Sequence, residues 1–392
     1  MIASFYPPQR TLMGPGPSDV SPRVLSAMAR PTIGHLDPLF VQMMDDLKSL
    51  LQYAFQTKNT LTIPVSAPGS AGMETCFVNL IEAGETVIVC QNGVFGLRMQ
   101  ENIERCGGKA VMVQDEWGRA CDPQKLEDAL KANPDAKFVA FVHAETSTGA
   151  STDVKAMCEV AHRYDCLTIV DAVTSLAGSP LDVDDWGVDA VYSGTQKCLS
   201  CTPGLSPISF NEVALNVIKH RKTKVQSWFL DLNLVMAYWG EGVKRAYHHT
   251  APINALYALH ECLLMLKEEG LEQAWARHQT HHQALKAGLE SLGLDFVVPE
   301  SERLPQLNAV RIPDGVNDAQ VRAMLLQDYQ LEIGAGLGVM AGNVWRIGLM
   351  GYACRKDNVF KCLAALDDVL ARLHAPVNHG GAIAAARAIY GK

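Results

Sequence analysis

Apolar and polar residues follow two repeating patterns over the first half of the chain. Short apolar runs predict strands, and longer stretches whose apolar residues recur every three or four positions predict helices. The predicted strands lie at 61–65, 86–90, 109–113, 137–142, 167–171 and 188–192. The predicted helices lie at 20–30, 38–56, 71–82, 94–106, 123–132 and 153–164. This alternation predicts an α/β fold with a mostly parallel sheet between helices, and such sheets bind ligands at the carboxyl ends of their strands.

The pattern changes after about residue 250. It is almost wholly helical to about residue 290, and it then predicts a smaller α+β region that ends with a helix near Leu373. A chain of 392 residues accords with two domains. We therefore expect an N-terminal arm (1–16), a large domain (17–269), a small C-terminal domain (270–373) and a tail (374–392).

Composition and charge narrow the classes of function. The net charge is −8 and no long Lys/Arg run occurs, which argues against a nucleic-acid partner. The chain also lacks the window of about 18 uncharged apolar residues that a membrane span needs. The eleven cysteines are scattered through apolar runs, as reduced thiols usually are, and the N-terminus has no signal-peptide pattern. We expect a cytoplasmic protein without a membrane partner.

Two strand-end residues carry the most specific chemical signal. Asp171 closes one apolar run, and Lys197 follows another that ends at Tyr192. Enzymes that use pyridoxal phosphate (PLP) need such a pair, because a lysine forms a Schiff base with the cofactor aldehyde and an acid keeps the pyridine nitrogen protonated. Taken alone, Asp171 would equally suit the N-cap of a helix beginning near Val173, and Lys197 would suit a surface charge. Together the two residues favour PLP chemistry.

Further segments could complete a PLP site. The small residues at 66–72 lead directly into an apolar helix, whose free amides would bind phosphate, although an ordinary capped turn is the commoner outcome. Phe95 could stack on a planar ring or belong to the core. Ser147 could donate a hydrogen bond to cofactor or substrate, or be an ordinary loop residue. Arg346 lies inside an apolar strand, where a substrate carboxylate or a structural salt bridge would offset its burial.

Two clusters have some features of metal sites. Cys198 and Cys201 have the spacing of zinc ligands, but no second cysteine pair lies at the spacing that a zinc site needs. His278, His281 and His282 share one side of a predicted helix without an acid or cysteine beside them, so we expect a polar surface there. We predict no metal site.

Seven stretches of the chain resemble the class V (fold type I) PLP aminotransferases. The resemblance is strongest to the alanine–glyoxylate and serine–pyruvate (serine–glyoxylate) branch, and it extends from about residue 11 to 373. The matching stretches are Leu12–Ser18 (LMGPGPS), Ile33–Asp37 (IGHLD), His143–Gly149 (HAETSTG), Val170–Leu176 (VDAVTSL), Ser193–Lys197 (SGTQK), Tyr247–Thr250 (YHHT) and Val344–Gly348 (VWRIG).

The resemblance implies a fold and a role for each matching residue. The fold would be a mostly parallel seven-stranded sheet between helices, followed by a smaller α+β domain. Lys197 and Asp171 would be catalytic, as Schiff-base lysine and partner of the pyridine nitrogen. The implied cofactor contacts are Phe95 and Val173 on the two ring faces, Ser147 beside the ring oxygen, and Ser70, Ala71 and Gln196 at the phosphate.

The resemblance also implies substrate contacts and an assembly. Arg346 would hold the substrate carboxylate, and Ser147, Gly16 and His35 would line the same substrate site. Tyr247 and Thr250 would reach the phosphate bound by the neighbouring subunit, which implies a homodimer with shared active sites.

The implied activity is transfer of an amino group from alanine or serine to glyoxylate or pyruvate, by ping-pong kinetics through pyridoxamine phosphate. The alternative is the (S)-ureidoglycine–glyoxylate aminotransferase group of purine breakdown. That group has a glutamine in place of His35, whereas the tail from about Gly380 is similar to it. A PLP lyase or desulfurase on the same fold, and a non-catalytic protein on this scaffold, are more distant alternatives.

Overall fold

A seven-stranded sheet forms the centre of the molecule. The computed structural model describes residues 2–240 and 245–391. The strand order is β2-β10-β9-β8-β5-β3-β4, and all neighbours are parallel except that β10 is antiparallel to both β2 and β9. The bounds are β2 Leu61–Val65, β3 Thr86–Gln91, β4 Lys109–Gln114, β5 Ala136–Val142, β8 Leu167–Asp171, β9 Ala190–Tyr192 and β10 Ser206–Phe210. The expected mostly parallel seven-stranded sheet is confirmed.

Most strands of the central sheet are continuous apolar runs in the sequence, because both faces of the sheet are buried. Every residue of β2, β3, β9 and β10 is buried, because helices cover both faces of the sheet. The edge strand β4 is more polar and exposes Lys109 and Gln114. The helices that accompany this sheet are α1 Pro22–Met28, α2 Pro38–Phe55, α3 Gly69–Leu80, α4 Val94–Arg105, α5 Pro123–Ala132, α6 Val154–His162, α7 Glu212–Lys219 and α8 Leu232–Trp239.

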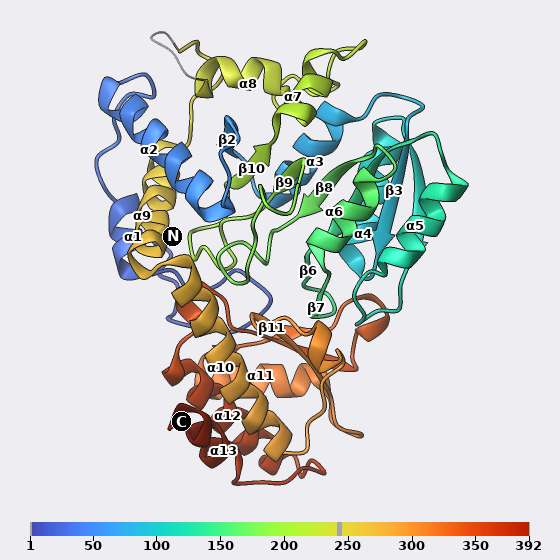
Figure 1. The fold of residues 1–392 in the computed structure, drawn as a ribbon. Helices are drawn as coiled ribbons and strands as arrows, with labels where there is room; N and C mark the ends of the chain where they lie inside the picture. Colours follow the sequence, from blue (N-terminus) through green and yellow to red (C-terminus); the bar gives the residue numbers. More distant parts are fainter. Residues whose placement is uncertain (1, 241–244, 392) are drawn as a thin grey trace.

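Two consecutive helices link the sheet region to the C-terminal region. Helix α9 (Ile253–Glu269) ends at Gly270 and α10 (Leu271–Ser291) begins directly after it. Gly270 has a φ of 90°, which a residue with a side chain rarely adopts, so the glycine allows the chain to break and continue as a second helix. In Figure 1 these helices run from the upper to the lower part of the molecule.

The C-terminal region has its own sheet and hydrophobic core. Strands β11 (Leu307–Arg311), β14 (Val344–Gly348) and β13 (Gly334–Ala335) pair antiparallel in that order. Trp345 and Ile347 of β14 are fully buried in this core. Its helices, together with α10, are α11 Asp318–Tyr329, α12 Lys356–Arg372 and α13 Ala382–Tyr390.

The two chain ends both join this second core. In the arm, β1 (Thr11–Leu12) pairs parallel with β12 (Leu331–Glu332), and Met13 is buried among the C-terminal residues. At the other end, α13 buries Ala382 and Ala386 in the same core and contacts α10 and α12. The domain boundaries expected at 16, 269 and 373 stay predictions.

Most predicted elements are found within two residues of their expected ends. Strand β10 was not predicted, because its run SPISF mixes serine and proline with apolar residues although all five are buried. The expectation of a polar surface at His278 and His282 was wrong. Both are buried on the inner side of α10, where His278 accepts a hydrogen bond from the Gly351 amide and His282 pairs with Asn308.

The described ranges contain no helix that combines the length and the apolar character needed to cross a membrane. Within the same ranges no group of three or more His, Cys, Asp or Glu residues is arranged to hold a metal ion.

Candidate active site

The candidate active site begins where two neighbouring strands end. Asp171 is the last residue of β8 and Tyr192 the last residue of β9, and the two lie directly opposite each other in the parallel ladder. The chain then continues from β9 through residues 193–196 to Lys197. Because parallel strands place their carboxyl ends on one edge, the sheet brings the predicted acid and lysine to the same side of the molecule.

Asp171 is a buried carboxylate held by two donors. Its Oδ1 atom accepts a hydrogen bond from the Val173 amide at 2.8 Å, and its Oδ2 atom accepts one from the Tyr192 hydroxyl at 2.8 Å. Burial raises the pKa of Asp171 to about 7, although both hydrogen bonds act to lower it. The segment after Asp171 forms turns, so the carboxylate does not cap a helix near Val173.

Lys197 lies under the N-terminal arm. Its Nζ atom donates a hydrogen bond to the Pro15 carbonyl, and its own carbonyl accepts one from the Ser18 hydroxyl at 2.8 Å. Gly16 passes so close that a Cβ atom there would lie 2.6 Å from Nζ, and its φ of 106° also favours glycine. Burial lowers the pKa of Lys197 to about 8, with a further lowering by the Arg346 charge. The lysine therefore gives up its proton far more readily than an ordinary lysine, as a nucleophilic amine should.

A cradle of small residues lies beside Asp171 and Lys197. Val173 packs against both Gly69, the first residue of α3, and Gly194, which precedes Lys197. Helix α3 begins without a side-chain cap, so the amides of Gly69 and Ser70 are available to a phosphate, whereas the Ala71 amide donates to the Pro68 carbonyl at 2.7 Å. The Gln196 Oε1 atom is buried and lacks a hydrogen-bond partner among the described residues.

The predicted phosphate contacts differ in their exposure. Ser70 is exposed and Ala71 half-buried in the first turn of α3. A Cβ atom on Gly194 would lie 2.8 Å from Gln196 Oε1, so the glycine leaves space beside this unpaired oxygen. The structure thus brings the start of α3 and the loop before Lys197 together.

Phe95 and Ser147 are held together by a residue that the sequence analysis did not single out. Glu145 is fully buried and accepts hydrogen bonds from the Ser147 hydroxyl and from the Phe95 amide, at 2.6 and 3.2 Å. The Arg98 guanidinium lies over the Phe95 ring, 4.9 Å from its centre. Burial raises the pKa of Glu145 above its ordinary value.

Arg346 reaches the site from β14 in the C-terminal sheet. Its Nε atom donates to the Ala335 carbonyl at 2.6 Å, and Nη1 donates to the Thr146 carbonyl at 3.1 Å. Within the described residues it forms no ion pair, so the structural salt bridge considered above is absent there. Its Nη2 edge remains available for a planar carboxylate. Burial lowers the pKa of Arg346 to about 10, a value at which it remains charged at pH 7.

Three predicted residues form a separate group. The rings of His35 and Tyr247 lie 5.2 Å apart, and the Tyr247 hydroxyl is 3.4 Å from the Thr250 hydroxyl. Tyr247 is 62% exposed. Over residues 2–240 and 245–391, none of the three has a hydrogen bond or ring contact with the group around Lys197.

The chain matches a known family over most of its length. The sequence profile described as aminotransferase class-V covers residues 19–358. The chain belongs to the class V aminotransferase family. Alanine–glyoxylate aminotransferase of Rattus norvegicus is 40% identical over 373 residues, which are 95% of this chain and 89% of that protein. The protein is therefore an aminotransferase, and the lyase and non-catalytic alternatives are set aside.

Two solved aminotransferase structures have the same architecture. Ureidoglycine–glyoxylate aminotransferase from Bacillus subtilis is 40% identical with a TM-score of 0.97, and the match covers 100% of both chains. Alanine–glyoxylate aminotransferase from Nostoc sp. is 44% identical with a TM-score of 0.92, and the match covers 94% of this chain and 97% of the other. The fold is therefore that of fold type I PLP aminotransferases.

Class V aminotransferases use PLP, and the residues of this aminotransferase fit that cofactor. The uncapped start of α3 and the side-chain amide of Gln196, whose NH2 group could donate to a phosphate, border a space that glycines keep open. The fit extends to the ring, since Asp171 is a buried acid with a raised pKa and Lys197 a buried amine with a lowered one.

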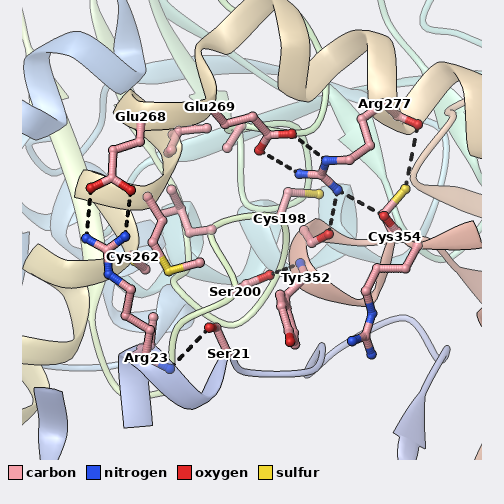
Figure 2. Close-up of a pocket in the computed structure, with 17 residues that line it drawn as sticks. Ser21, Arg23, Cys198, Ser200, Cys262, Glu268, Glu269, Arg277, Tyr352 and Cys354 are labelled. Atoms are coloured by element: carbon pink, nitrogen blue, oxygen red, sulfur yellow. Dashed lines mark hydrogen bonds and ion pairs between the residues drawn. The ribbon is translucent and has the colours of Figure 1, made fainter. Parts of the chain in front are cut away.

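A cavity separate from this site lies against residues 198–200, which directly follow Lys197. It has a volume of about 460 Å³ and is lined by parts of α1, α9, α10 and the turn at 351–355. Figure 2 shows two ion pairs among its charged groups, Arg23 with Glu268 and Arg277 with Glu269. Arg355 also lines the cavity but pairs with Asp19 outside it. Neither Asp171 nor Lys197 lines it. The Arg23–Glu268 pair joins α1 to α9, and the Arg277–Glu269 pair joins α10 to the end of α9 across Gly270.

Sequence reasoning missed three residues of this site. Tyr192 was taken only as a strand residue, and its signal was its position at the end of the strand beside Asp171. Glu145 could have been found as an acid three residues after the buried strand β5, which ends at Val142. Pro15 gave no chemical signal, because it acts through a backbone carbonyl that any residue carries.

Proposed function

We propose that this aminotransferase moves an amino group from alanine or serine to glyoxylate. The supporting observation is that Asp171 and Arg346 both lie close enough to Lys197 to act on its pKa, which Arg346 lowers and Asp171 raises. An amine, an acid for the pyridine nitrogen and a guanidinium fork for a carboxylate are what transfer between small amino and oxo acids needs. Pyruvate is a second acceptor that the same groups would accommodate.

Each residue has a task that follows from its environment. PLP, when bound, supplies an aldehyde and an electron-accepting ring. Asp171 would keep a proton on the ring nitrogen, and Arg346 would orient the substrate carboxylate. Lys197 would remove the proton from the substrate Cα atom and return it at the cofactor carbon that carried the aldehyde. Phe95 and Val173 would lie on the two faces of the PLP ring. Ser70, Ala71 and Gln196 would hold its phosphate, and Ser147, Gly16 and His35 would line the substrate side.

We infer that the active enzyme is a homodimer. Tyr247 and Thr250 are exposed and lie away from the Lys197 group of their own chain. They would reach the phosphate bound by the other subunit. This arrangement would explain why an aromatic residue as large as Tyr247 remains 62% exposed in the single chain.

Ureidoglycine is the second candidate amino donor. The ureidoglycine–glyoxylate aminotransferase structure matches 100% of this chain, whereas the alanine–glyoxylate aminotransferase structure from Nostoc sp. matches 94%. Both named activities share glyoxylate as the acceptor, so the two candidates differ only in the donor.

The deciding experiment is a half-reaction with one donor at a time. The holoenzyme is mixed with alanine, serine or ureidoglycine without acceptor, and the visible absorbance of the lysine-bound cofactor and the oxo product are followed. We expect alanine or serine to convert the cofactor and Lys197→Ala to convert none. Conversion by ureidoglycine alone would replace the proposed donor. Full turnover by Lys197→Ala would contradict the assignment of the lysine.

A further inference from the structure

We propose that Glu145 is a positioning residue that fixes Phe95 and Ser147 as one rigid unit against the cofactor ring. The inference rests on the proposed function of the site. Glu145 is fully buried and uses both carboxylate oxygens. Its Oε1 atom accepts from the Ser147 amide and hydroxyl at 2.9 and 2.6 Å, and Oε2 accepts from the Phe95 amide at 3.2 Å.

These hydrogen bonds supply the cap that α4 lacks. Gly93 is the N-cap residue of α4 and has no side chain to accept from the first amides. The Val94 amide donates instead to the Ser147 hydroxyl at 3.0 Å, and the next amide, that of Phe95, donates to Glu145. A negative carboxylate is favoured at a helix N-terminus by the free amides and the helix dipole. The loop at 145–147 therefore caps α4 and holds Phe95 in its first turn.

Close packing leaves little freedom in this unit. A Cβ atom on Gly93 would lie 2.4 Å from Glu145 Cδ and 2.5 Å from the Ser147 hydroxyl oxygen. The carboxylate can thus approach the helix only because residue 93 has no side chain. The single proton of the Ser147 hydroxyl is directed at Glu145, which leaves an oxygen lone pair of fixed direction for a bound partner.

Glu145 also acts on the charge of Arg346. Burial lowers the pKa of Arg346, and the nearby Glu145 carboxylate opposes this effect. In return, Arg346 helps Glu145 to remain ionised against burial. One carboxylate therefore orients two predicted ring contacts and supports the residue predicted to hold the substrate.

The test compares Glu145→Gln with a matched control, Glu82→Gln. Glu82 accepts the same kinds of bond, from the Lys222 amide and from the Thr223 amide and hydroxyl, but it lies outside the site. Glu145→Gln keeps the size of the side chain and replaces one acceptor by a donor. We expect its PLP dissociation constant to rise about 10- to 100-fold. We also expect an altered visible circular dichroism of bound PLP, and Glu82→Gln should change neither quantity.

Two further measurements show whether Glu145 acts through its partners. Ser147→Ala combined with Glu145→Gln should weaken PLP binding by less than the product of the single effects. In the apoprotein, amide hydrogen exchange at Val94 and Phe95 should be faster in Glu145→Gln than in the unaltered chain. Unchanged exchange, or PLP affinity and dichroism equal to those of the unaltered holoenzyme, would overturn the proposal. If the unaltered protein binds no PLP, the proposed function fails, and the exchange measurement still decides the role of Glu145 in the cap.

Discussion

Burial shifts the pKa of three residues in the candidate site, each in the direction that favours the uncharged form. Asp171 has a pKa of about 7, Lys197 about 8 and Arg346 about 10. Removing water disfavours an ionised group unless an opposite charge replaces it. A pyridinium nitrogen beside Asp171 and a substrate carboxylate beside Arg346 are such charges. A bound cofactor and substrate would therefore supply the opposite charges that these buried groups lack in the protein alone.

The raised pKa of Asp171 predicts how the stability of the apoprotein depends on pH. An unfolded aspartate ionises near pH 3.9 and the folded one near 7, so the folded state binds more protons between these values. Relative to Asp171→Asn, the free energy of unfolding of the unaltered apoprotein should fall by about 1.4 kcal/mol per pH unit over this window. It should then be level above pH 7. Urea unfolding of both proteins measures the difference, and parallel pH profiles would contradict the raised pKa.

At the scale of elements, function depends on where strands and helices end. Asp171 and Tyr192 end adjacent parallel strands, and α3 and α4 both begin without a cap from their own N-cap residue. In α3 the free amides face the predicted phosphate cradle, whereas in α4 the loop at 145–147 satisfies them. Two similar helix starts thus serve different purposes, ligand binding in one and positioning in the other.

The start of α4 should tolerate no side chain at residue 93. Gly93→Ala would place Cβ against Glu145 and Ser147, and we expect it to lower the free energy of unfolding by about 1–3 kcal/mol. Gly381→Ala is the control, since its Cβ would meet nothing closer than 3.6 Å. Denaturant unfolding of the two variants checks the prediction. Equal stability of the two would show that the contact at residue 93 relaxes without cost.

At the scale of the whole molecule, the site is assembled from distant parts of the chain. The arm supplies the Pro15 carbonyl, the large sheet supplies Asp171 and Lys197, and the C-terminal sheet supplies Arg346. The two sheet regions are joined through α9 and α10, and the Arg277–Glu269 ion pair bridges Gly270 between these helices (Figure 2). Movement between the regions would therefore change the distance between the lysine and the arginine.

A shared active site predicts complementation between two defective chains. Lys197→Ala removes the lysine, and a Tyr247→Phe/Thr250→Val chain removes the two hydroxyls that we assign to the partner's phosphate. A mixed dimer of these chains would have one intact site. Random mixing should then restore roughly a quarter of the activity of the unaltered enzyme. Activity equal only to the average of the two parent proteins would show that Tyr247 and Thr250 serve their own chain.

The sequence by itself determined the local order of the fold and indicated Asp171, Lys197 and Arg346 as candidate site residues, but not Glu145. Strands β2 and β8 and helix α5 were predicted with their observed bounds, because apolar runs and helical spacing report burial directly. Asp171 and Lys197 were recognisable because strand ends of a parallel sheet face a crevice. Strand β10 was not predicted, because its serines look polar in the sequence and are buried only through its pairing with β2 and β9 in the folded sheet.

Only the tertiary structure decided which groups surround those residues. Tyr192 acts on Asp171 because of strand register, Pro15 acts on Lys197 through a backbone carbonyl, and Glu145 caps a helix that begins some fifty residues before it. None of these contacts joins residues close together in sequence, so no local pattern encodes them. Their physical cause is that buried polar groups must find partners in space, wherever the folded chain supplies them.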